Sequence, residues 1–376
     1  MVVRVVTCKL RNSRRRDLAR LDAVLDLCRV LYNAALQERV DAWRKAHKSL
    51  SFYDQSKSLT TVRADDPAYA VLDATMTRMT VLRRLDLAFK GFFRRVKAGL
   101  TPGFPRYKGK GRFDTLVFGD RGWKVQDRKL VLKGIGWFRL TSGPHKVGKP
   151  KGLHLVQKLG RWYAHIVYEF PTPVRVEPQT SVGIDVGLKT FATLSDGTTV
   201  GHPKFLARGL EVLASAERAL SRKKKGSNGR RKARAALAHI HAKIANRRRD
   251  FLHNTSRIIV DRFDLIAVEK LNVIAMSRGL KNLRRSITDS AWSTFIRMLS
   301  YKAECAGRAV ISVNPKGTST RCSDCGTHVP KTLAERVHTC PTCGLVMDRD
   351  LNAARNIHDL GWRLVSGAQR PHGVSA

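Results

Sequence analysis

Apolar residues in the first hundred positions are spaced as in one strand followed by two helices. Val2–Leu10 is predicted to be a strand, and the basic run Arg11–Arg16 follows it. From Leu18 to Ala35 apolar residues recur every three or four positions, which predicts an amphipathic helix. A second helical stretch is predicted from about Ala74 to Val96, and the prolines of residues 101–105 break it.

The pattern changes to short strands between Phe113 and Phe170. Glycines punctuate this region, and strands are predicted at residues 129–133, 136–140 and 162–170. We expect a small β-barrel here, with Val2–Leu10 as its first strand and the helices of about 15–100 inserted. Pro171–Pro173 is predicted to be a linker.

Past Thr180 the pattern is typical of an α/β domain. Strands are predicted at 181–186, 191–194, 265–268 and 309–313, with a hairpin turn at 195–197. A long helix is predicted before the strand at 265–268, with one apolar stripe formed by Leu237, Ile240, Ile244, Phe251 and Ile258. Further helices are predicted at 290–306 and 351–360, and residues 367–376 are expected to be a disordered tail.

The chain carries far more positive than negative charge. Its 376 residues include 71 Lys and Arg but 30 Asp and Glu, which gives a net charge of +41. Such a charge opposes a compact state unless a polyanion offsets it. Because the basic residues occur along the whole chain, nucleic acid is favoured over an acidic substrate or an anionic membrane patch. The length favours two or three domains, and no segment approaches the roughly 18 apolar residues of a membrane-spanning helix.

Four of the seven cysteines form two CxxC pairs near the C-terminus. They are Cys322, Cys325, Cys340 and Cys343. Four thiolates suit tetrahedral Zn²⁺, and a full set of four ligands predicts a structural rather than a catalytic ion. Gly326 and Gly344 follow each pair, where a tight turn is needed. The alternative is that these are reduced core cysteines, and we expect the nearby His338 to be a surface residue.

Three acidic residues stand at the ends of predicted elements. Asp185 ends an apolar strand, Glu269 directly follows another, and Asp350 begins the last helix. Strands of one sheet can bring such ends together. Clustered carboxylates need cations, and two Mg²⁺ ions about 4 Å apart would clamp the attacking and leaving oxygens of a phosphodiester. Singly, each has a simpler interpretation: Asp185 as a turn residue, Glu269 as a surface charge, Asp350 as a helix N-cap. Asp348 competes with Asp350 for the metal role.

Basic residues gather in several runs, of which we single out ten as candidates for phosphate contact. They are Arg94, Arg95, Arg106, Lys108, Lys110, Arg112, Lys223, Lys224, Arg230 and Arg231. For any single run a solvated face is the simpler explanation, but their sum favours nucleic acid. Tyr53, Phe104 and Tyr107 could stack on bases or pack against sugars, or they could be core residues.

The order and spacing of several motifs resemble those of TnpB, the transposon-encoded RNA-guided nucleases related to the miniature type V CRISPR effectors. The C-terminal motifs are GIDVGLKT, AVEKLN, NPKGTSTRCSDCG, CPTCG and DRDLNAARNI. The N-terminal segments YNAALQER, FYDQSKSLT and RRLDLAFKGFFRRVKAGLTPGFPRYKGKGR are similar to that family too. The resemblance therefore spans nearly the whole chain.

The resemblance implies an α+β multidomain fold. Residues 1–14 and 101–172 would form a wedge β-barrel, interrupted by a helical recognition domain at 15–100. Residues 173–317 and 345–366 would form an α/β RNase H-like (RuvC) nuclease domain, with a zinc ribbon inserted at 318–344.

The resemblance also implies an RNA-guided endonuclease. It would cut double-stranded DNA beside a short transposon-associated motif, with a guide RNA from the transposon end as partner and Mg²⁺ as cofactor. Asp185, Glu269 and Asp350 occupy the family's three catalytic acid positions, and the register of the last motif selects Asp350 over Asp348.

For the flanking-motif contacts the candidates are Tyr53, Ser56 and Lys57. A monomer is slightly favoured over a dimer. We expect the protein to be located in the cytoplasm of a bacterium or archaeon, associated with the nucleoid.

Three other functions share part of this pattern. A guide-dependent repressor without cleavage would lack one of the three acids, and all three are present. A DNA-strand transposase would share the two-metal chemistry but would bind transposon ends without RNA. A junction resolvase on the same RNase H fold fits poorly with the large N-terminal half and the four cysteines.

Overall fold

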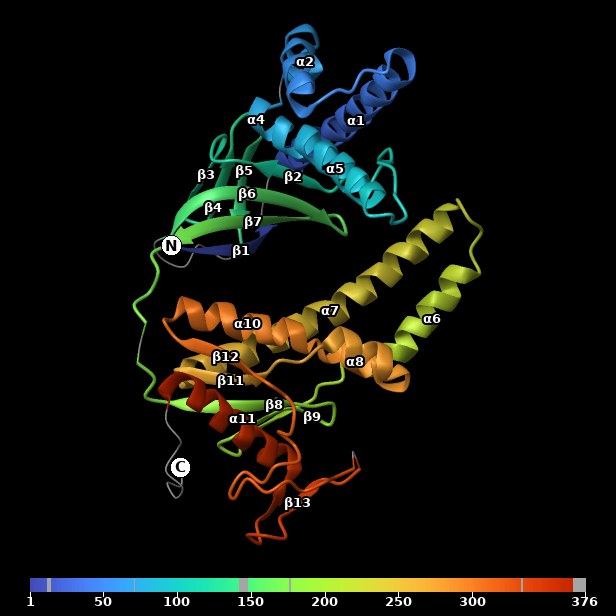
Figure 1. The fold of residues 1–376 in the computed structure, drawn as a ribbon. Coiled ribbons are helices and arrows are strands. Elements are labelled where there is room, and N and C mark those ends of the chain that lie inside the picture. The colour runs from blue at the N-terminus through green and yellow to red at the C-terminus, as the bar shows by residue number, and fades with distance from the viewer. Residues whose placement is uncertain (12–14, 71, 142–147, 176, 333, 368–376) are drawn as a thin grey trace. The chain divides into compact units, whose positions relative to one another are not determined.

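The computed structural model describes residues 1–11, 15–70, 72–141, 148–175, 177–332 and 334–367. The chain forms two compact units, Met1–Pro171 and Thr172–Ala376. Each is a β-sheet carrying helices, so the fold is mixed α/β (Figure 1).

The first unit is built on a seven-stranded antiparallel sheet. Its strands are β1 (Val2–Arg11), β2 (Thr115–Phe118), β3 (Trp123–Gln126), β4 (Lys129–Leu132), β5 (Gly136–Leu140), β6 (Lys149–Lys158) and β7 (Arg161–Phe170). Their order in the sheet is β2-β6-β7-β1-β5-β4-β3. The N-terminal strand lies at the centre, paired with β7 and β5. The prediction that this strand joins the later strands in one sheet is confirmed. The order ends at β2 and β3, so the strands of the described chain approach a barrel without closing it.

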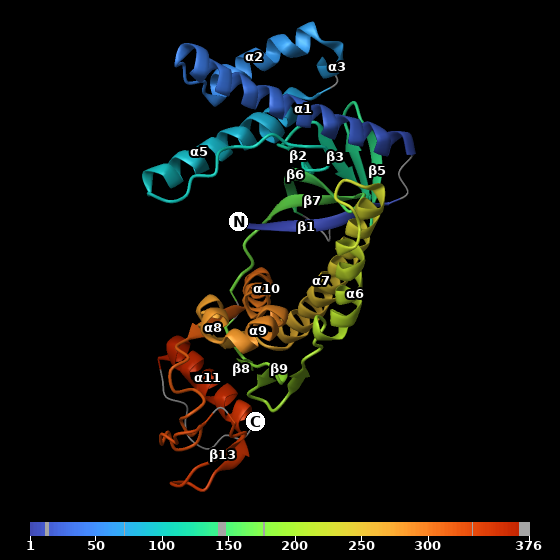
Figure 2. The same cartoon turned by 90° about the vertical axis from the view of Figure 1, so that its right-hand side faces the viewer.

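In the sequence, the helices of the first unit lie between β1 and β2. They are α1 (Arg15–Ala46), α2 (Phe52–Asp65), α3 (Pro67–Ala70), α4 (Ala74–Thr77), the π-helical turn η1 (Arg78–Leu82) and α5 (Arg83–Lys97). Both views show them gathered on one side of the sheet (Figures 1 and 2). The two predicted helices are confirmed, the second with a π-helical turn inside it. Buried apolar residues of α1, such as Leu21 and Tyr32, share one core with Phe138 and Ile166 of the sheet.

The second unit contains a five-stranded sheet and a separate hairpin. Its strands are β8 (Ser181–Val186), β9 (Thr190–Leu194), β10 (Thr199–Gly201), β11 (Leu265–Glu269) and β12 (Ala309–Val313), with β13 (Val337–Thr339) and β14 (Val346–Asp348) in the hairpin. The order is β10-β9-β8-β11-β12. β8, β11 and β12 run parallel, whereas β9 and β10 are antiparallel to their neighbours.

Helices cover both faces of this sheet. The helices of the second unit are η2 (Ala207–Gly209), α6 (Leu210–Ser221), α7 (Asn228–Arg262), α8 (Val273–Gly279), η3 (Lys281–Leu283), α9 (Arg284–Ser290), α10 (Trp292–Cys305) and α11 (Arg349–Ser366). Side chains of β11 alternate between the faces. Ile266 and Val268 pack with residues of α7 and α10, whereas Ala267 packs with Ile357 of α11.

Gly183 lets α11 lie directly on the backbone of β8. A Cβ at this position would come within 2.1 Å of the carbonyl oxygen of Ala354, so only glycine fits. Ser181 is hydrogen-bonded to His358 at 2.7 Å, and Gly183 lies against Ala354. Asp185, farther along the strand, is affected by the charge of Asp350, so β8 and α11 run in opposite directions. The first turn of α11 therefore lies beside the C-terminal end of β8.

The predicted apolar stripe of α7 is wrong at Ile258, which is 59% exposed. The buried apolar residues of the C-terminal part are Leu252, Ile259 and Val260, which pack into the sheet core. Ile240 and Ile244 instead face α6. A helix of 35 residues meets different neighbours along its length, so no single stripe stays buried throughout.

Two further predictions concern the C-terminal tail and membrane-spanning helices. The tail predicted at 367–376 lies outside the described residues except for Gly367, which caps α11. In the described part of the chain, no helix combines the length and apolar character needed to cross a membrane.

Candidate functional site

The three predicted acidic residues come from three elements that meet at one edge of the five-stranded sheet. Asp185 lies near the end of β8 and Glu269 ends β11, and these strands are parallel neighbours. Asp350 lies in the first turn of α11, which packs on both strands. Because parallel strands present their carboxyl ends at the same edge, residues distant in sequence come together there.

Burial and crowding strongly affect the ionisation of these side chains. Burial raises the pKa of Asp185 well above its ordinary value, and the negative charges of Glu269 and Asp350 raise it further. Burial also raises the pKa of Glu269, which the hydroxyl of Thr318 partly offsets. Such crowded carboxylates fit divalent cations, because a cation would relieve both the repulsion and the loss of hydration.

The surroundings of Glu269 and Asp350 differ. Thr318, which is buried, donates its hydroxyl hydrogen to Oε1 of Glu269 at 2.5 Å. Asp350 lies between two guanidinium groups, with Oδ1 at 3.4 Å from Nε of Arg349 and 3.9 Å from Nη1 of Arg336. One acid is therefore held by a neutral donor and the other by cations.

Asp348, not Asp350, is the N-cap of α11. Oδ1 of Asp348 accepts hydrogen bonds from the backbone N–H groups of Asp350 at 2.8 Å and Leu351 at 3.1 Å. These bonds satisfy amides that the first turn of a helix leaves unpaired. The simpler interpretation of Asp350 as a helix cap is therefore excluded, and its carboxylate remains available at the site.

Among the described residues, one group of three or more potential metal ligands has converging donor atoms. It is formed by the four cysteines, whose sulfur atoms all lie within 4.8 Å of one another.

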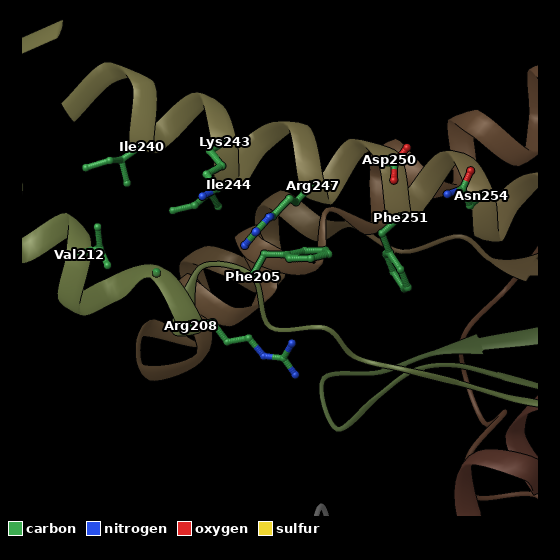
Figure 3. Close-up of a pocket in the computed structure, with 11 residues that line it drawn as sticks. Phe205, Arg208, Val212, Ile240, Lys243, Ile244, Arg247, Asp250, Phe251 and Asn254 are labelled. Carbon is green, nitrogen blue, oxygen red and sulfur yellow. The ribbon is translucent and has the colours of Figure 1, made fainter. Parts of the chain in front are cut away.

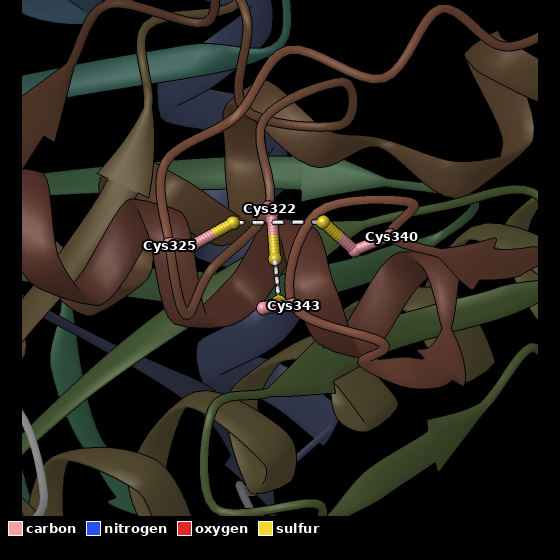
Figure 4. A group of neighbouring side chains, drawn as sticks. All are labelled: Cys322, Cys325, Cys340 and Cys343. Carbon is pink, nitrogen blue, oxygen red and sulfur yellow. Dashed lines mark hydrogen bonds between the residues drawn. The ribbon is translucent and has the colours of Figure 1, made fainter.

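The four cysteines, here called the cysteine quartet (Cys322, Cys325, Cys340 and Cys343), converge from two loops. Figure 4 shows their sulfur atoms turned toward one another. Sγ of Cys322 lies 3.6 Å from Sγ of Cys343, and Sγ of Cys325 lies 3.5 Å from Sγ of Cys340. With Zn–S bonds of about 2.3 Å, the sulfurs of a tetrahedral site are about 3.8 Å apart. The quartet thus fits one tetrahedral zinc ion.

Each half of the quartet is a turn closed by glycine. Gly326 and Gly344 have φ angles of +76° and +74°, a region that favours glycine. Their N–H groups donate to the carbonyls of Cys322 and Cys340, each at 3.0 Å. The predicted tight turns are therefore confirmed.

Two asparagines of α11 bind the loop that carries the first cysteine pair. Buried Asn352 accepts from the N–H of Ser323 at 2.9 Å and donates to the carbonyl of Arg321 at 2.7 Å. Asn356 donates to the carbonyls of Arg321 and Thr318, both at 2.8 Å. The helix that carries Asp350 thus also holds the quartet and Thr318.

Sequence reasoning missed this connection. Asn352 and Asn356 are four residues apart, a spacing that places both on one face of a helix. Polar amides at that spacing, in the motif that contains Asp350, were the available signal. Their partners are backbone groups of a distant loop, which a sequence pattern does not identify.

The prediction that His338 is a surface residue is wrong, because it is fully buried. Residues alternate along β13, so Val337 and Thr339 point outward and His338 points inward. Its Nδ1 contacts Nζ of Lys331. Burial lowers the pKa of His338, and the nearby charge of Lys331 lowers it further.

The residues predicted to bind nucleic acid differ in their surroundings. Arg230 donates from Nη1 to the carbonyls of Leu220 at 3.0 Å and Lys223 at 2.8 Å, which holds the turn between α6 and α7. The hydroxyl of Ser56 donates within α2 to the carbonyl of Phe52. Arg95 donates to the carbonyl of Gly103 at 2.9 Å. These side chains have partners inside the protein.

Most of the other candidates are exposed, and their contacts with nucleic acid stay predictions. Lys108 is half-buried, with Nζ 5.7 Å from the ring centroid of Tyr32. The exposed residues are Tyr53, Lys57, Arg94, Arg106, Lys110, Arg112, Lys223, Lys224 and Arg231.

A pocket of about 630 Å³ lies between α6 and α7 (Figure 3). Its apolar lining includes Ile240 and Ile244, which explains why these residues of the predicted stripe are only half-buried. Arg208, Lys243 and Arg247 add positive charge around it.

Comparison with known proteins identifies the family. Residues 165–279 match a family described as "Probable transposase" (OrfB_IS605), and residues 292–357 match the Cas12f1-like TNB domain. A Streptomyces pristinaespiralis protein named for RNA-guided DNA endonuclease activity is 33% identical over 351 residues, covering 90% of this chain and 85% of the relative. The Escherichia coli K12 protein InsQ, named for the same activity, is 31% identical over 350 residues, covering 88% and 85%.

The chain therefore belongs to the TnpB family, as its motifs indicate. A solved structure of the mini-RNA-guided endonuclease CRISPR-Cas phi3 matches with a TM-score of 0.51 at 9% identity, covering 100% of this chain and 94% of that one. At this identity the match concerns the fold alone.

Proposed function

We propose that this protein is an RNA-guided endonuclease that cuts double-stranded DNA beside a short flanking motif. The names of its relatives support guidance by RNA and cleavage of DNA. The net charge of +41 supports partners that are polyanions. In RNA-guided recognition, base pairing reads the target sequence, so the protein needs positive charge rather than an elaborate recognition helix.

The observation that carries the proposal is the convergence of Asp185, Glu269 and Asp350. The mutual effect of their charges on the pKa of Asp185 supports their close approach. We assign residues 173–317 and 345–366 to an RNase H-like (RuvC) nuclease on this basis, with a zinc ribbon at 318–344. In the first unit we assign the sheet to a wedge domain and the helices of 15–100 to a recognition domain.

The three carboxylates would hold two Mg²⁺ ions. When bound, these ions polarise a phosphodiester and favour the ionised form of an attacking water. The protein's own contribution is to place the carboxylates at adjoining ends of two strands and a helix. Thr318 orients Glu269, and Arg349 and Arg336 keep the charge of Asp350 balanced.

A pair of matched substitutions in α11 tests the assignment. Asp350→Asn removes one of the three carboxylate charges. Asp348→Asn removes the neighbouring charge but keeps a side chain that caps helices well. We expect Asp350→Asn to bind guide RNA and target DNA but to lose cleavage by at least about 100-fold, and Asp348→Asn to cleave like the wild type.

The opposite pattern would show that Asp348 is the functional acid. Full cleavage by both variants would place the nuclease site elsewhere. Loss of binding by Asp350→Asn, with a normal melting temperature, would assign that residue to nucleic-acid contact instead of metal binding.

A further inference from the structure

The first unit has a pocket of about 730 Å³ between α1, α5 and residues 104–107. It is unusually aromatic, and the rings that line it are Trp43, Phe89, Phe92, Phe93, Phe104 and Tyr107. Four of them are open to solvent: Trp43 is 57% exposed, Phe93 60%, Phe104 49% and Tyr107 52%. Phe104 and Tyr107 are therefore not core residues, which settles one alternative that the sequence leaves open.

Singly exposed apolar side chains are common, but four open aromatic rings at one hollow are not. The volume is that of a pocket for a small organic group. Its lining is also fixed. Phe89 and Phe92 contact Phe104 edge-to-face, with centroids 5.6 and 5.3 Å apart. The hydroxyl of Tyr107 is hydrogen-bonded to Oε1 of Gln37.

Positive charge surrounds these rings. The lining includes Arg39, Arg44 and Lys48 and no carboxylate. The guanidinium of Arg39 lies 5.1 Å from the ring centroid of Phe89, and its Nε donates to Gln55, so this arginine belongs to the wall of the pocket. Arg44 and Lys48 are exposed at the rim. An occupant with a flat apolar body and a negative charge complements this arrangement.

We propose that this pocket binds unpaired nucleobases of an RNA strand, with Arg44 and Lys48 against the adjoining phosphates. Aromatic side chains stack on bases that are splayed out of a strand, and cations beside them track the backbone. Base pairs inside a duplex do not expose their faces, so the pocket suits loops or single-stranded parts of a guide RNA. A second copy of the chain fits less well, because it would bring another +41 charges toward the same rim.

The inference rests on the proposed function but is tested by binding instead of cleavage. The experiment measures the affinity of the full chain, freed of co-purified RNA, for a single-stranded oligoribonucleotide of mixed sequence and for the same sequence as a duplex. Trp43→Leu and Phe104→Leu keep apolar volume but remove the stacking face, whereas Trp43→Phe keeps a ring. Tyr301→Leu removes an exposed aromatic residue of α10, outside the pocket.

We expect Trp43→Leu and Phe104→Leu each to weaken single-strand binding by at least about fivefold. Duplex binding, and the dependence of affinity on salt, should not change, because no phosphate contact is lost. Trp43→Phe and Tyr301→Leu should bind like the wild type. Arg44→Gln should instead reduce the salt dependence.

Three results would overturn the inference. The first is unchanged single-strand binding by both leucine variants, or an equal loss for single strand and duplex. The second is that an oligodeoxyribonucleotide binds as tightly as the oligoribonucleotide and that its affinity depends equally on Trp43. This result would assign the pocket to single-stranded DNA. The third is a wild-type dimer that Trp43→Leu converts to a monomer, which would assign the pocket to an interface between copies. None of these outcomes depends on whether the carboxylates cleave DNA.

Discussion

Thr318 donates its hydroxyl hydrogen to Glu269 across 2.5 Å, and its own carbonyl accepts a hydrogen bond from Asn356 of α11. The loop before the first cysteine pair thus connects the acid at the end of β11 with the helix that carries Asp350. The cysteine quartet, through Ser323 and Asn352, is bound to the same helix. One connected set of contacts therefore positions two of the three carboxylates.

Thr318→Val should impair the carboxylate site without unfolding it, because valine has nearly the same shape but cannot hold Glu269. Groups that orient metal ligands typically affect metal affinity or activity about 10- to 100-fold. We expect cleavage to need about tenfold more Mg²⁺, and a Mg²⁺ titration of the cleavage rate measures this. Thr318→Ser, which keeps the hydroxyl, should behave like the wild type. An unchanged Mg²⁺ requirement in Thr318→Val would show that the hydrogen bond has no role in orienting Glu269.

Asn352→Ala should destabilise the second unit and loosen the quartet. The substitution leaves the N–H of Ser323 and the carbonyl of Arg321 without their partner, which typically costs about 1–3 kcal/mol for buried groups. Chemical denaturation and the rate of zinc loss to a chelator measure the two effects. Asn228→Ala, at an exposed position of α7, is the matched control. Equal effects of both substitutions would remove Asn352 from this role.

Cys322→Ser should abolish stoichiometric zinc binding, because three remaining thiolates and a hydroxyl do not replace the four-sulfur set. Metal analysis of the purified protein should give one zinc per wild-type chain and a marked loss in the variant. Cys305→Ser lies outside the quartet and should keep its zinc. Retention of one zinc by Cys322→Ser would contradict the proposed ligand set.

Lys302 should make stability depend on pH in the alkaline range. Burial lowers its pKa from 10.5 to about 8, although Nζ donates to the carbonyl of His253 and the hydroxyl of Ser256. Between about pH 8 and 10.5 the unfolded chain therefore binds more protons at this residue than the folded chain. The free energy of unfolding therefore rises with pH across that window, by at most about 1.4 kcal/mol per pH unit. Below about pH 8 the folded protein bears the full destabilisation caused by burying the charged lysine.

The difference in unfolding free energy between the wild type and Lys302→Met isolates this effect, because other groups titrate in both proteins. We expect the difference to shift in favour of the wild type as the pH rises from 8 to 10.5. Parallel curves would mean that Lys302 keeps an ordinary pKa in the folded protein.

Much of the second unit could be predicted because its signals are local. Continuous apolar runs mark β8 and β11, and the acids that follow them lie at the strand ends. The spacing of the cysteines alone indicates the quartet. The convergence of Asp185 with Asp350 depends additionally on Gly183, whose missing side chain lets α11 approach.

Features that depend on neighbours from elsewhere in the chain were not predictable in the same way. Helix α2 has few buried residues, so its apolar spacing gives little signal. What defines its start is a capping box between Ser51 and Asp54. His338 is buried on the inward face of the β13–β14 hairpin, where it contacts Lys331. The exposed rings of Phe104 and Tyr107 cannot be told from core residues until α1 and α5 are in place.

The central claim is that guide RNA directs cleavage by the three carboxylates. The most direct test purifies the wild-type protein and Asp185→Ala with their co-purified RNA, sequences that RNA, and offers each complex DNA that does or does not match it. We predict that both proteins carry the same discrete RNA and bind the matching DNA, and that only the wild type cuts it. Cleavage that ignores the match, or equal cleavage by Asp185→Ala, would contradict the account.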